Sequence, residues 1–241
     1  MFPCAILCGG LATRLRPITE TVPKSLVPIG GEPFLAHQLR LLQRKGVREV
    51  VLCVGHLGEM IQDFAQDGRD FGLNLAYSFD GAPLLGTAGA IRKALPRLGE
   101  RFFVLYGDSY LDCDYAAIAD VFTASNKSGL MTIYRNEGNF DASNVQAENG
   151  VILRYDKKNR TPQMRYIDYG LGAFQRFVFE ALPSNQVCDL AGIYQSLLAA
   201  SDLAAYEVQE RFYEIGSPSG ITDLEQYLAK ANPSHHLTES A

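Results

Sequence analysis

The chain has 241 residues, 47% of them hydrophobic, and a formal net charge of −5 at pH 7. This length is enough for one well-packed domain, and the negative charge argues against a broad surface for nucleic acid or an anionic membrane. No apolar run approaches the roughly 20 residues that span a bilayer, and no basic segment with an apolar core opens the chain, so we expect a cytoplasmic protein.

The first part of the chain alternates strand-like and helix-like segments. Leu35, Leu39 and Leu42 recur with helical spacing, and the apolar run at 102–106 is typical of a strand buried on both faces. In chain order we expect a strand at 3–7, a helix at 34–45, a strand at 47–54, a helix at 58–66, a strand at 73–78, a helix from Thr87 (as N-cap) to Leu98 and a strand at 102–106. This order predicts an α/β fold with a Rossmann-like, mostly parallel central sheet flanked by helices.

After residue 128 the pattern changes. Segments 129–135 and 151–155 read as strands, and Asn149-Gly150 is a strong signal for a tight turn between extended segments. Segment 165–174 is aromatic, extended and interrupted by glycine. Helices are expected at 175–182, 187–201 and 219–231. We therefore expect antiparallel strands to be mixed into the second half of the sheet.

Residues 7–28, LCGGLATRLRPITETVPKSLVP, carry the clearest functional signal. Gly9 and Gly10 follow the first strand and let a ligand approach backbone N–H groups that a Cβ would shield. Arg14 can hold phosphate oxygens through its planar guanidinium, and Lys24 adds a point charge. This combination in an acidic chain predicts a site for a small polyphosphate.

Two further segments are expected at the edge of the sheet where open parallel sheets bind ligands. One precedes an expected helix and the other follows an expected strand. The run LGTAG occupies 85–89, and Gly107-Asp108 follows the buried strand at 102–106. Asp108 is suited to act as a ligand for a magnesium ion, although a carboxylate at this position can also simply cap the next turn. Proximity to a phosphate loop favours the magnesium interpretation.

The five cysteines have no metal-site spacing. Cys4 and Cys53 lie in apolar runs and are expected in the core. Cys8 lies beside the glycine turn and could be exposed, but the neighbouring sequence offers no base to activate a catalytic thiol.

The motifs GGLATRLRP, PKSLVP, LGTAG and GD, in this order, resemble those of the sugar-1-phosphate nucleotidylyltransferases, the enzymes that make NDP-sugars. The resemblance covers about residues 3–230. It implies the nucleotide-diphospho-sugar transferase fold and a Mg²⁺-dependent reaction of an NTP with a sugar 1-phosphate. It further implies one domain over 1–231, with a nucleotide-binding half at 1–128 and a sugar-phosphate-binding half at 129–231, followed by a flexible tail at 232–241.

The resemblance also implies roles for single residues on the nucleotide side. Arg14, Lys24 and Asp108 are the expected catalytic residues. The residues expected to bind the nucleotide are Leu7, Gly9, Gly10, Thr13, Arg14, Lys24, Gly86 and Thr87.

On the acceptor side, Asp108 and Glu214 match the two magnesium ligands of the family. Lys157 matches the lysine that holds the sugar phosphate, and Asp168 and Gly170 match the segment that lines the sugar site.

Three positions depart from the family pattern. Ala12 replaces a glycine, which costs about 1 kcal/mol if the backbone there needs a positive φ. Glu214 replaces an aspartate and is one methylene longer, and Lys158 competes with Lys157 for the phosphate.

The chain looks most like the short bacterial mannoheptose-1-phosphate guanylyltransferases and N-acetylmuramate-1-phosphate uridylyltransferases, and we expect GTP and a manno-configured heptose 1-phosphate as substrates. UTP- or CTP-dependent transfer to another sugar 1-phosphate, and a non-catalytic regulatory protein that binds sugar nucleotides, are the alternatives. An NAD-dependent oxidoreductase would need Gly-x-Gly-x-x-Gly, which residues 9–14 do not provide. Neither nucleic acid nor membrane is an expected partner, and a homo-oligomer is compatible with the sequence.

Overall fold

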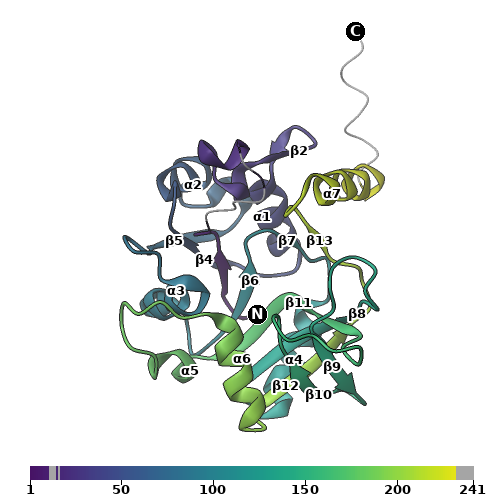
Figure 1. The fold of residues 1–241 in the computed structure, drawn as a ribbon. Helices are drawn as coiled ribbons and strands as arrows, with labels where there is room; N and C mark the ends of the chain where they lie inside the picture. Colours follow the sequence, from purple (N-terminus) through teal and green to yellow (C-terminus); the bar gives the residue numbers. More distant parts are fainter. Residues whose placement is uncertain (11–14, 16, 232–241) are drawn as a thin grey trace.

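A mixed β-sheet forms the centre of the protein (Figure 1), which is seen here in a computed structural model that describes residues 1–10, 15 and 17–231. Among these residues, nine strands join in one sheet. Its parallel part has the order β6-β1-β4-β5. These strands are β1 (Cys4–Leu7), β4 (Glu49–Val54), β5 (Asn74–Phe79) and β6 (Arg101–Tyr106). The predicted α/β class with a mostly parallel centre is confirmed.

The sheet continues on the other side of β6 with antiparallel strands. The long strand β11 (Tyr166–Gln175) pairs antiparallel with β6, β8 (Gly129–Arg135) and β9 (Val145–Glu148). Strand β10 (Val151–Tyr155) pairs antiparallel with β9, and β12 (Leu203–Val208) pairs parallel with β8. The prediction that antiparallel strands are mixed into the second half of the sheet is therefore confirmed.

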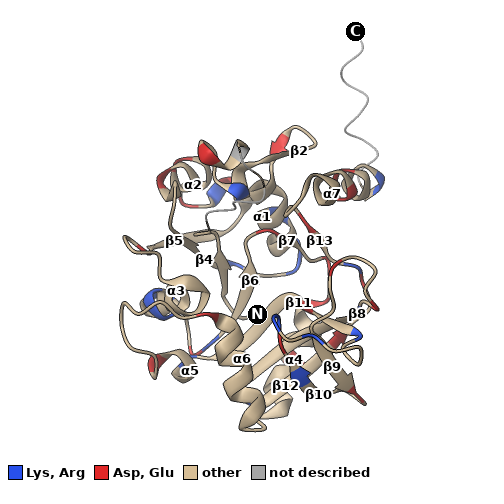
Figure 2. Cartoon of the chain, in the orientation of Figure 1, with Lys and Arg blue, Asp and Glu red and all other residues tan. Residues whose placement is uncertain are grey.

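Helices cover both faces of the sheet. Successive strand residues point to opposite faces, so neighbouring residues of β1 contact different helices. Cys4 and Ile6 pack with α1 (Phe34–Arg44), α2 (Gly58–Ala65) and α4 (Tyr115–Ser125). Ala5, between them, packs with α3 (Gly86–Ala94), α5 (Phe177–Glu180) and α6 (Leu190–Ala199) on the other face. Figure 2 shows that the central strands β1, β4 and β6 are almost free of charged residues.

Smaller elements surround the main sheet. Short 3₁₀ helices lie at Ile18–Glu20, Lys24–Leu26, Arg69–Phe71 and Leu95–Arg97. Two-stranded sheets join β2 (Pro28–Ile29) to β3 (Glu32–Pro33) and β7 (Ser109–Tyr110) to β13 (Tyr213–Glu214). The last helix, α7 (Pro218–Ala231), buries Leu224 against Ile29 and Phe34. Among the described residues, none of the helices has both the length and the apolarity to cross a bilayer.

Several sequence expectations need correction. The helix expected at 175–182 is only the short α5, and α6 is shorter than the predicted 187–201. Thr87 is not an N-cap, because α3 begins at Gly86 and the Thr87 hydroxyl accepts a hydrogen bond from Leu190 N instead. Helix α4 and strands β9 and β12 were not predicted. The expected tail at 232–241 lies outside the described residues.

Candidate active site

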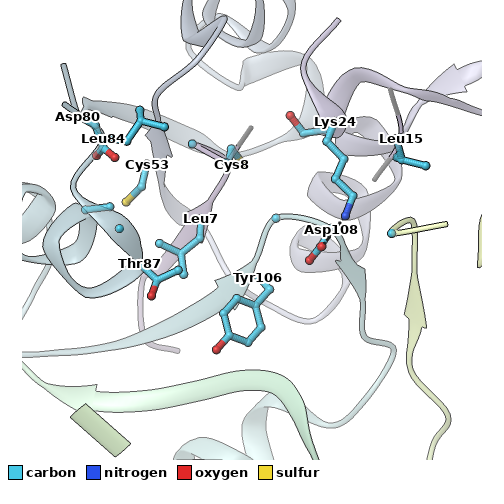
Figure 3. A pocket seen from close by; sticks show the side chains of 17 residues that line it. Leu7, Cys8, Leu15, Lys24, Cys53, Asp80, Leu84, Thr87, Tyr106 and Asp108 are labelled. Atoms are coloured by element: carbon cyan, nitrogen blue, oxygen red, sulfur yellow. Dashed lines mark hydrogen bonds and ion pairs between the residues drawn. The ribbon is translucent and has the colours of Figure 1, made fainter. Parts of the chain in front are cut away.

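A cavity of about 400 Å³ opens at the carboxyl ends of the parallel strands (Figure 3). Each of the four parallel strands contributes a residue at or near its end to the lining. These residues are Leu7 of β1, Cys53 of β4, Tyr106 of β6 and Asp80, which directly follows β5. Ligands bind at this edge of open α/β sheets. The topology therefore places the cavity where the sequence predicted the site.

Most residues expected to bind the nucleotide meet in this cavity. Those that line it are Leu7, Gly9, Gly10, Lys24, Gly86 and Thr87. Asp108, expected as a catalytic residue and metal ligand, also lines it. Thr13, Arg14 and the departure at Ala12 lie outside the described residues. The tertiary structure thus brings together segments that the chain separates by up to about a hundred residues.

Two of the glycines allow close contact between chain segments. A Cβ on Gly9 would lie 3.2 Å from Gly55 N, so Gly9 lets the loop after β1 pack against the loop after β4. Gly86 has φ +71°, and a Cβ there would lie 2.6 Å from Cys188 O. The start of α3 is tied to that segment, since Ala88 N donates to Cys188 O at 3.0 Å. Gly86 is therefore needed for packing of the cavity wall.

Lys24 and Asp108 form an ion pair in the cavity, with 2.6 Å between Nζ and Oδ2. Lys24 begins a 3₁₀ helix, and Asp108 stands in the turn between β6 and β7. Their side chains are 15% and 32% exposed, so both remain accessible to a ligand. Among the described residues the Asp108 carboxylate contacts the Lys24 ammonium and the Ser109 hydroxyl. It accepts no backbone N–H from them, which argues against a simple capping role.

Glu214 belongs to the strand that flanks the Asp108 turn. It pairs with Ser109 across β13 and β7, and Ile215 N donates to Asp108 O at 3.0 Å. Its side chain lines a second cavity of about 210 Å³, and Gly216 lines both cavities. In the part of the chain that the structure describes, no three metal-ligating side chains converge. A metal at Asp108 would therefore take further ligands from elsewhere, such as a substrate.

The residues expected to bind the sugar phosphate do not line this cavity, but all of them lie against Tyr106, which does. Lys157 Nζ lies 3.2 Å from the Tyr106 hydroxyl and 4.9 Å from the centre of its ring. It also lies 3.8 Å from Asp168 Oδ2. Gly170 has φ +101°, and a Cβ there would lie 3.3 Å from Tyr106. Lys157, rather than Lys158, is thus the lysine for which the structure shows contact with Tyr106.

Asp168 is the centre of a buried hydrogen-bond network. Its side chain is 2% exposed, and Oδ2 accepts hydrogen bonds from Tyr155 at 3.2 Å and Tyr106 at 3.4 Å. Oδ1 accepts from Gly170 N at 3.2 Å. Burial and, after it, the Asp168 charge raise the pKa of both tyrosines above the usual value, so both hydroxyls stay protonated and donate. Three protein donors thus fix the Asp168 carboxylate, which in turn holds Lys157 by charge.

Asp80 is a cavity residue that the sequence interpretation missed. It is 8% exposed, Oδ2 accepts a hydrogen bond from Leu85 N at 3.3 Å, and Oδ1 has no partner among the described residues. Burial raises the pKa of this carboxyl. The signal was available in the sequence, because Asp80 follows a predicted strand just as Asp108 does. A buried, unpartnered carboxylate oxygen in a cavity wall is a binding group for a donor on a ligand.

The sequence left the exposure of Cys8 open, and the structure buries this residue. Cys8 is 9% exposed, and burial followed by the nearby Asp108 charge raises the pKa of its thiol to about 12. A thiol with a raised pKa holds its proton at neutral pH, which argues against a thiolate nucleophile. Cys4 and Cys53 lie in the core as predicted.

Two curated relatives illustrate the similarity of the sequence to known proteins. The chain is 32% identical over 230 residues to UTP--glucose-1-phosphate uridylyltransferase from Synechocystis sp., covering 86% of this chain and 58% of the relative. It is 33% identical over 156 residues to D-glycero-alpha-D-manno-heptose 1-phosphate guanylyltransferase from Campylobacter jejuni, covering 64% of this chain and 67% of the relative. The chain thus spans about three fifths to two thirds of the length of these relatives.

The fold is similar to that of HddC from Yersinia pseudotuberculosis, solved in complex with GMP-PN. The TM-score is 0.79 at 22% identity, and the match covers 95% of this chain and all of HddC. The family model described as "Nucleotidyl transferase" matches residues 4–230. The chain therefore belongs to the nucleotidyl transferase family.

Proposed function

We propose that the protein transfers a nucleoside monophosphate from an NTP to a sugar 1-phosphate and releases pyrophosphate. The observation that carries the proposal is the Lys24–Asp108 pair, which stands in a cavity at the carboxyl ends of parallel strands beside Gly9 and Gly10. In this proposal residues 1–128 bind the nucleotide and residues 129–231 bind the sugar phosphate.

The chemistry requires positioning and charge neutralisation rather than a general base. The phosphate of a sugar 1-phosphate has a second pKa of about 6, so it is mostly a dianion and already nucleophilic at neutral pH. One of its oxygens forms a bond to the α-phosphorus of the NTP, and the bond from that phosphorus to the β-phosphate oxygen breaks. Lys24 neutralises the leaving pyrophosphate, and Lys157, fixed by Tyr106 and Asp168, aligns the attacking phosphate.

Nucleotidyltransferases of this family generally depend on a divalent metal ion, and the donor set fits Mg²⁺. The ion prefers oxygen ligands and is usually held by one or two carboxylates together with substrate phosphates. Asp108 and Glu214, on adjacent segments, would supply the carboxylates. When bound, Mg²⁺ would neutralise negative charge on the phosphates. Lys24 would then leave the Asp108 oxygen that it now contacts and move to the phosphates.

Asp80 supports GTP as the nucleotide. Figure 3 shows it across the cavity from the Lys24–Asp108 pair, where the base of a nucleotide would lie. The pairing edge of guanine presents two adjacent donors, N1–H and N2–H, which one carboxylate can accept together. Uracil would bring carbonyl oxygens against the same carboxylate. For the sugar we propose a manno-configured heptose 1-phosphate, in line with the name of the Campylobacter relative.

A pyrophosphate-release assay tests the proposal with ATP, GTP, CTP, UTP and dTTP, each combined with a panel of sugar 1-phosphates. We expect release with GTP and a manno-configured acceptor, and loss of turnover in Asp108→Asn at an unchanged melting temperature. Release with another NTP would refute the choice of base alone. Binding of NDP-sugars with no release from any pair would support the regulatory alternative.

A further inference from the structure

Gln38 contacts the backbone on both sides of the Asp108 turn. It lies on α1 and is 1% exposed. Its side-chain nitrogen donates to Tyr106 O at 3.2 Å and to Ser109 O at 2.8 Å. These are the carbonyls directly before and after Gly107-Asp108. One amide group thus spans the two-residue turn that carries the proposed metal ligand.

The turn is held from two other directions as well. Gly107 N donates to Leu7 O at 3.2 Å, and a Cβ on Gly107 would lie only 2.4 Å from that oxygen. On the opposite side, Ile215 N donates to Asp108 O at 3.0 Å. Strand β1 and the segment after β13 therefore restrain the turn from two sides, and Gln38 restrains it from the helix layer.

The other half of the Gln38 amide has no partner. Oε1 is buried and accepts no hydrogen bond from the described residues. A buried acceptor without a donor destabilises the folded protein, and an apolar side chain of similar size would avoid this cost. Leu35, Leu39 and Leu42 on the same helix show that such side chains suit its buried face. The glutamine is therefore better explained by the two carbonyls that it holds than by stability.

We propose that Gln38 is a positioning residue that fixes the Asp108 carboxylate for metal and phosphate binding. The role rests on the proposed transfer reaction, and Gln38 itself touches no substrate. Loss of the two hydrogen bonds frees the carbonyls of Tyr106 and Ser109, so the turn and its carboxylate can shift. A misplacement of about 1 Å in such a site can lower turnover about 100-fold.

The test replaces Gln38 by methionine, which keeps the volume and removes both donors. Gln38→Leu is the second variant, in case Gln38→Met does not fold, because leucine already occupies the buried face of this helix at Leu35, Leu39 and Leu42. Leu42→Met on the same helix is the matched control, because Leu42 is fully buried and its apolar side chain can make no hydrogen bond to the turn. The readouts are the melting temperature, kcat and KM for the NTP, and Mn²⁺ affinity in the presence of pyrophosphate, measured by electron paramagnetic resonance.

We expect kcat of the Gln38 variants to fall about 10- to 100-fold while KM for the NTP changes less than about threefold. Mn²⁺ affinity should fall at least about fivefold, and Leu42→Met should resemble the wild type in both readouts. Wild-type kcat and Mn²⁺ affinity in Gln38→Met, or an equal loss in Leu42→Met, would overturn the proposal. If the wild type releases no pyrophosphate, the proposed reaction fails, whereas the Mn²⁺ readout still decides whether Gln38 positions Asp108.

Discussion

The Lys24–Asp108 ion pair predicts that the lysine competes with a metal ion for the carboxylate. Asp108 Oδ2 lies 2.6 Å from the ammonium, and a divalent ion needs the same oxygen. Exposed ion pairs contribute about 0.2–1 kcal/mol, and the partial burial of Lys24 places this pair at about 1–2 kcal/mol. Because 1.4 kcal/mol corresponds to a factor of ten, Lys24→Gln should raise Mn²⁺ affinity of the nucleotide-free protein about 5- to 30-fold.

The assay is a titration of nucleotide-free protein with Mn²⁺, followed by electron paramagnetic resonance of the free ion. Lys45→Gln is the matched control, since Lys45 pairs with Asp112 at the same distance of 2.6 Å and similar partial exposure. Asp108→Asn should abolish the gained affinity. Turnover of Lys24→Gln should fall although the metal binds more tightly, because the phosphates lose the lysine. Unchanged or weaker Mn²⁺ binding in Lys24→Gln would refute the competition.

Other predictions concern the base, the acceptor and the cysteines. The raised pKa of Asp80 means that the folded protein gains stability as pH falls through that pKa. Asp80→Asn should therefore raise the melting temperature more at pH 7 than at a pH below the ordinary aspartate pKa of 3.8, by roughly 2–4 °C per kcal/mol of penalty removed. The same variant should lose preference for GTP by about tenfold or more in calorimetric titrations, and equal melting shifts at both pH values would count against a buried charge. Lys157→Ala should raise KM for the sugar 1-phosphate at least about tenfold with little change for the NTP, and a larger effect in Lys158→Ala would transfer the role to that lysine. Iodoacetamide at pH 8 should label the half-buried Cys188 and leave Cys8 unmodified by mass spectrometry, and labelling of Cys8 would contradict its burial.

Some elements were predictable because local signals agreed with the tertiary structure. Strands β8 and β10 match the predicted 129–135 and 151–155. For β10 the signal was the turn that precedes it, because Asn149 and Gly150 have the positive φ angles that their residue types favour. Helix α4 also had a local signal, because the Asp114 carboxylate caps it by accepting from Ala116 N and Ala117 N.

Strand β12 had no such signal. Its sequence LAAYEV has no clear strand alternation. Parallel pairing with β8 over the whole of its length decides the extended conformation, and that pairing joins residues about 74 positions apart. Context of this kind overrides local propensity, so the strand was not predicted.

The sequence by itself determined the family, the α/β class and the edge of the sheet at which the site lies. Gly9, Gly10 and Asp108 each follow a strand of the parallel sheet, and the carboxyl ends of parallel strands meet at one edge. Tertiary structure alone decided the partners of the side chains. The pairs Lys24–Asp108 and Tyr106–Asp168 join residues 84 and 62 positions apart, and Gln38 reaches carbonyls 68 and 71 positions away. Contacts at such separations depend on how helices and strands pack, which no local pattern encodes.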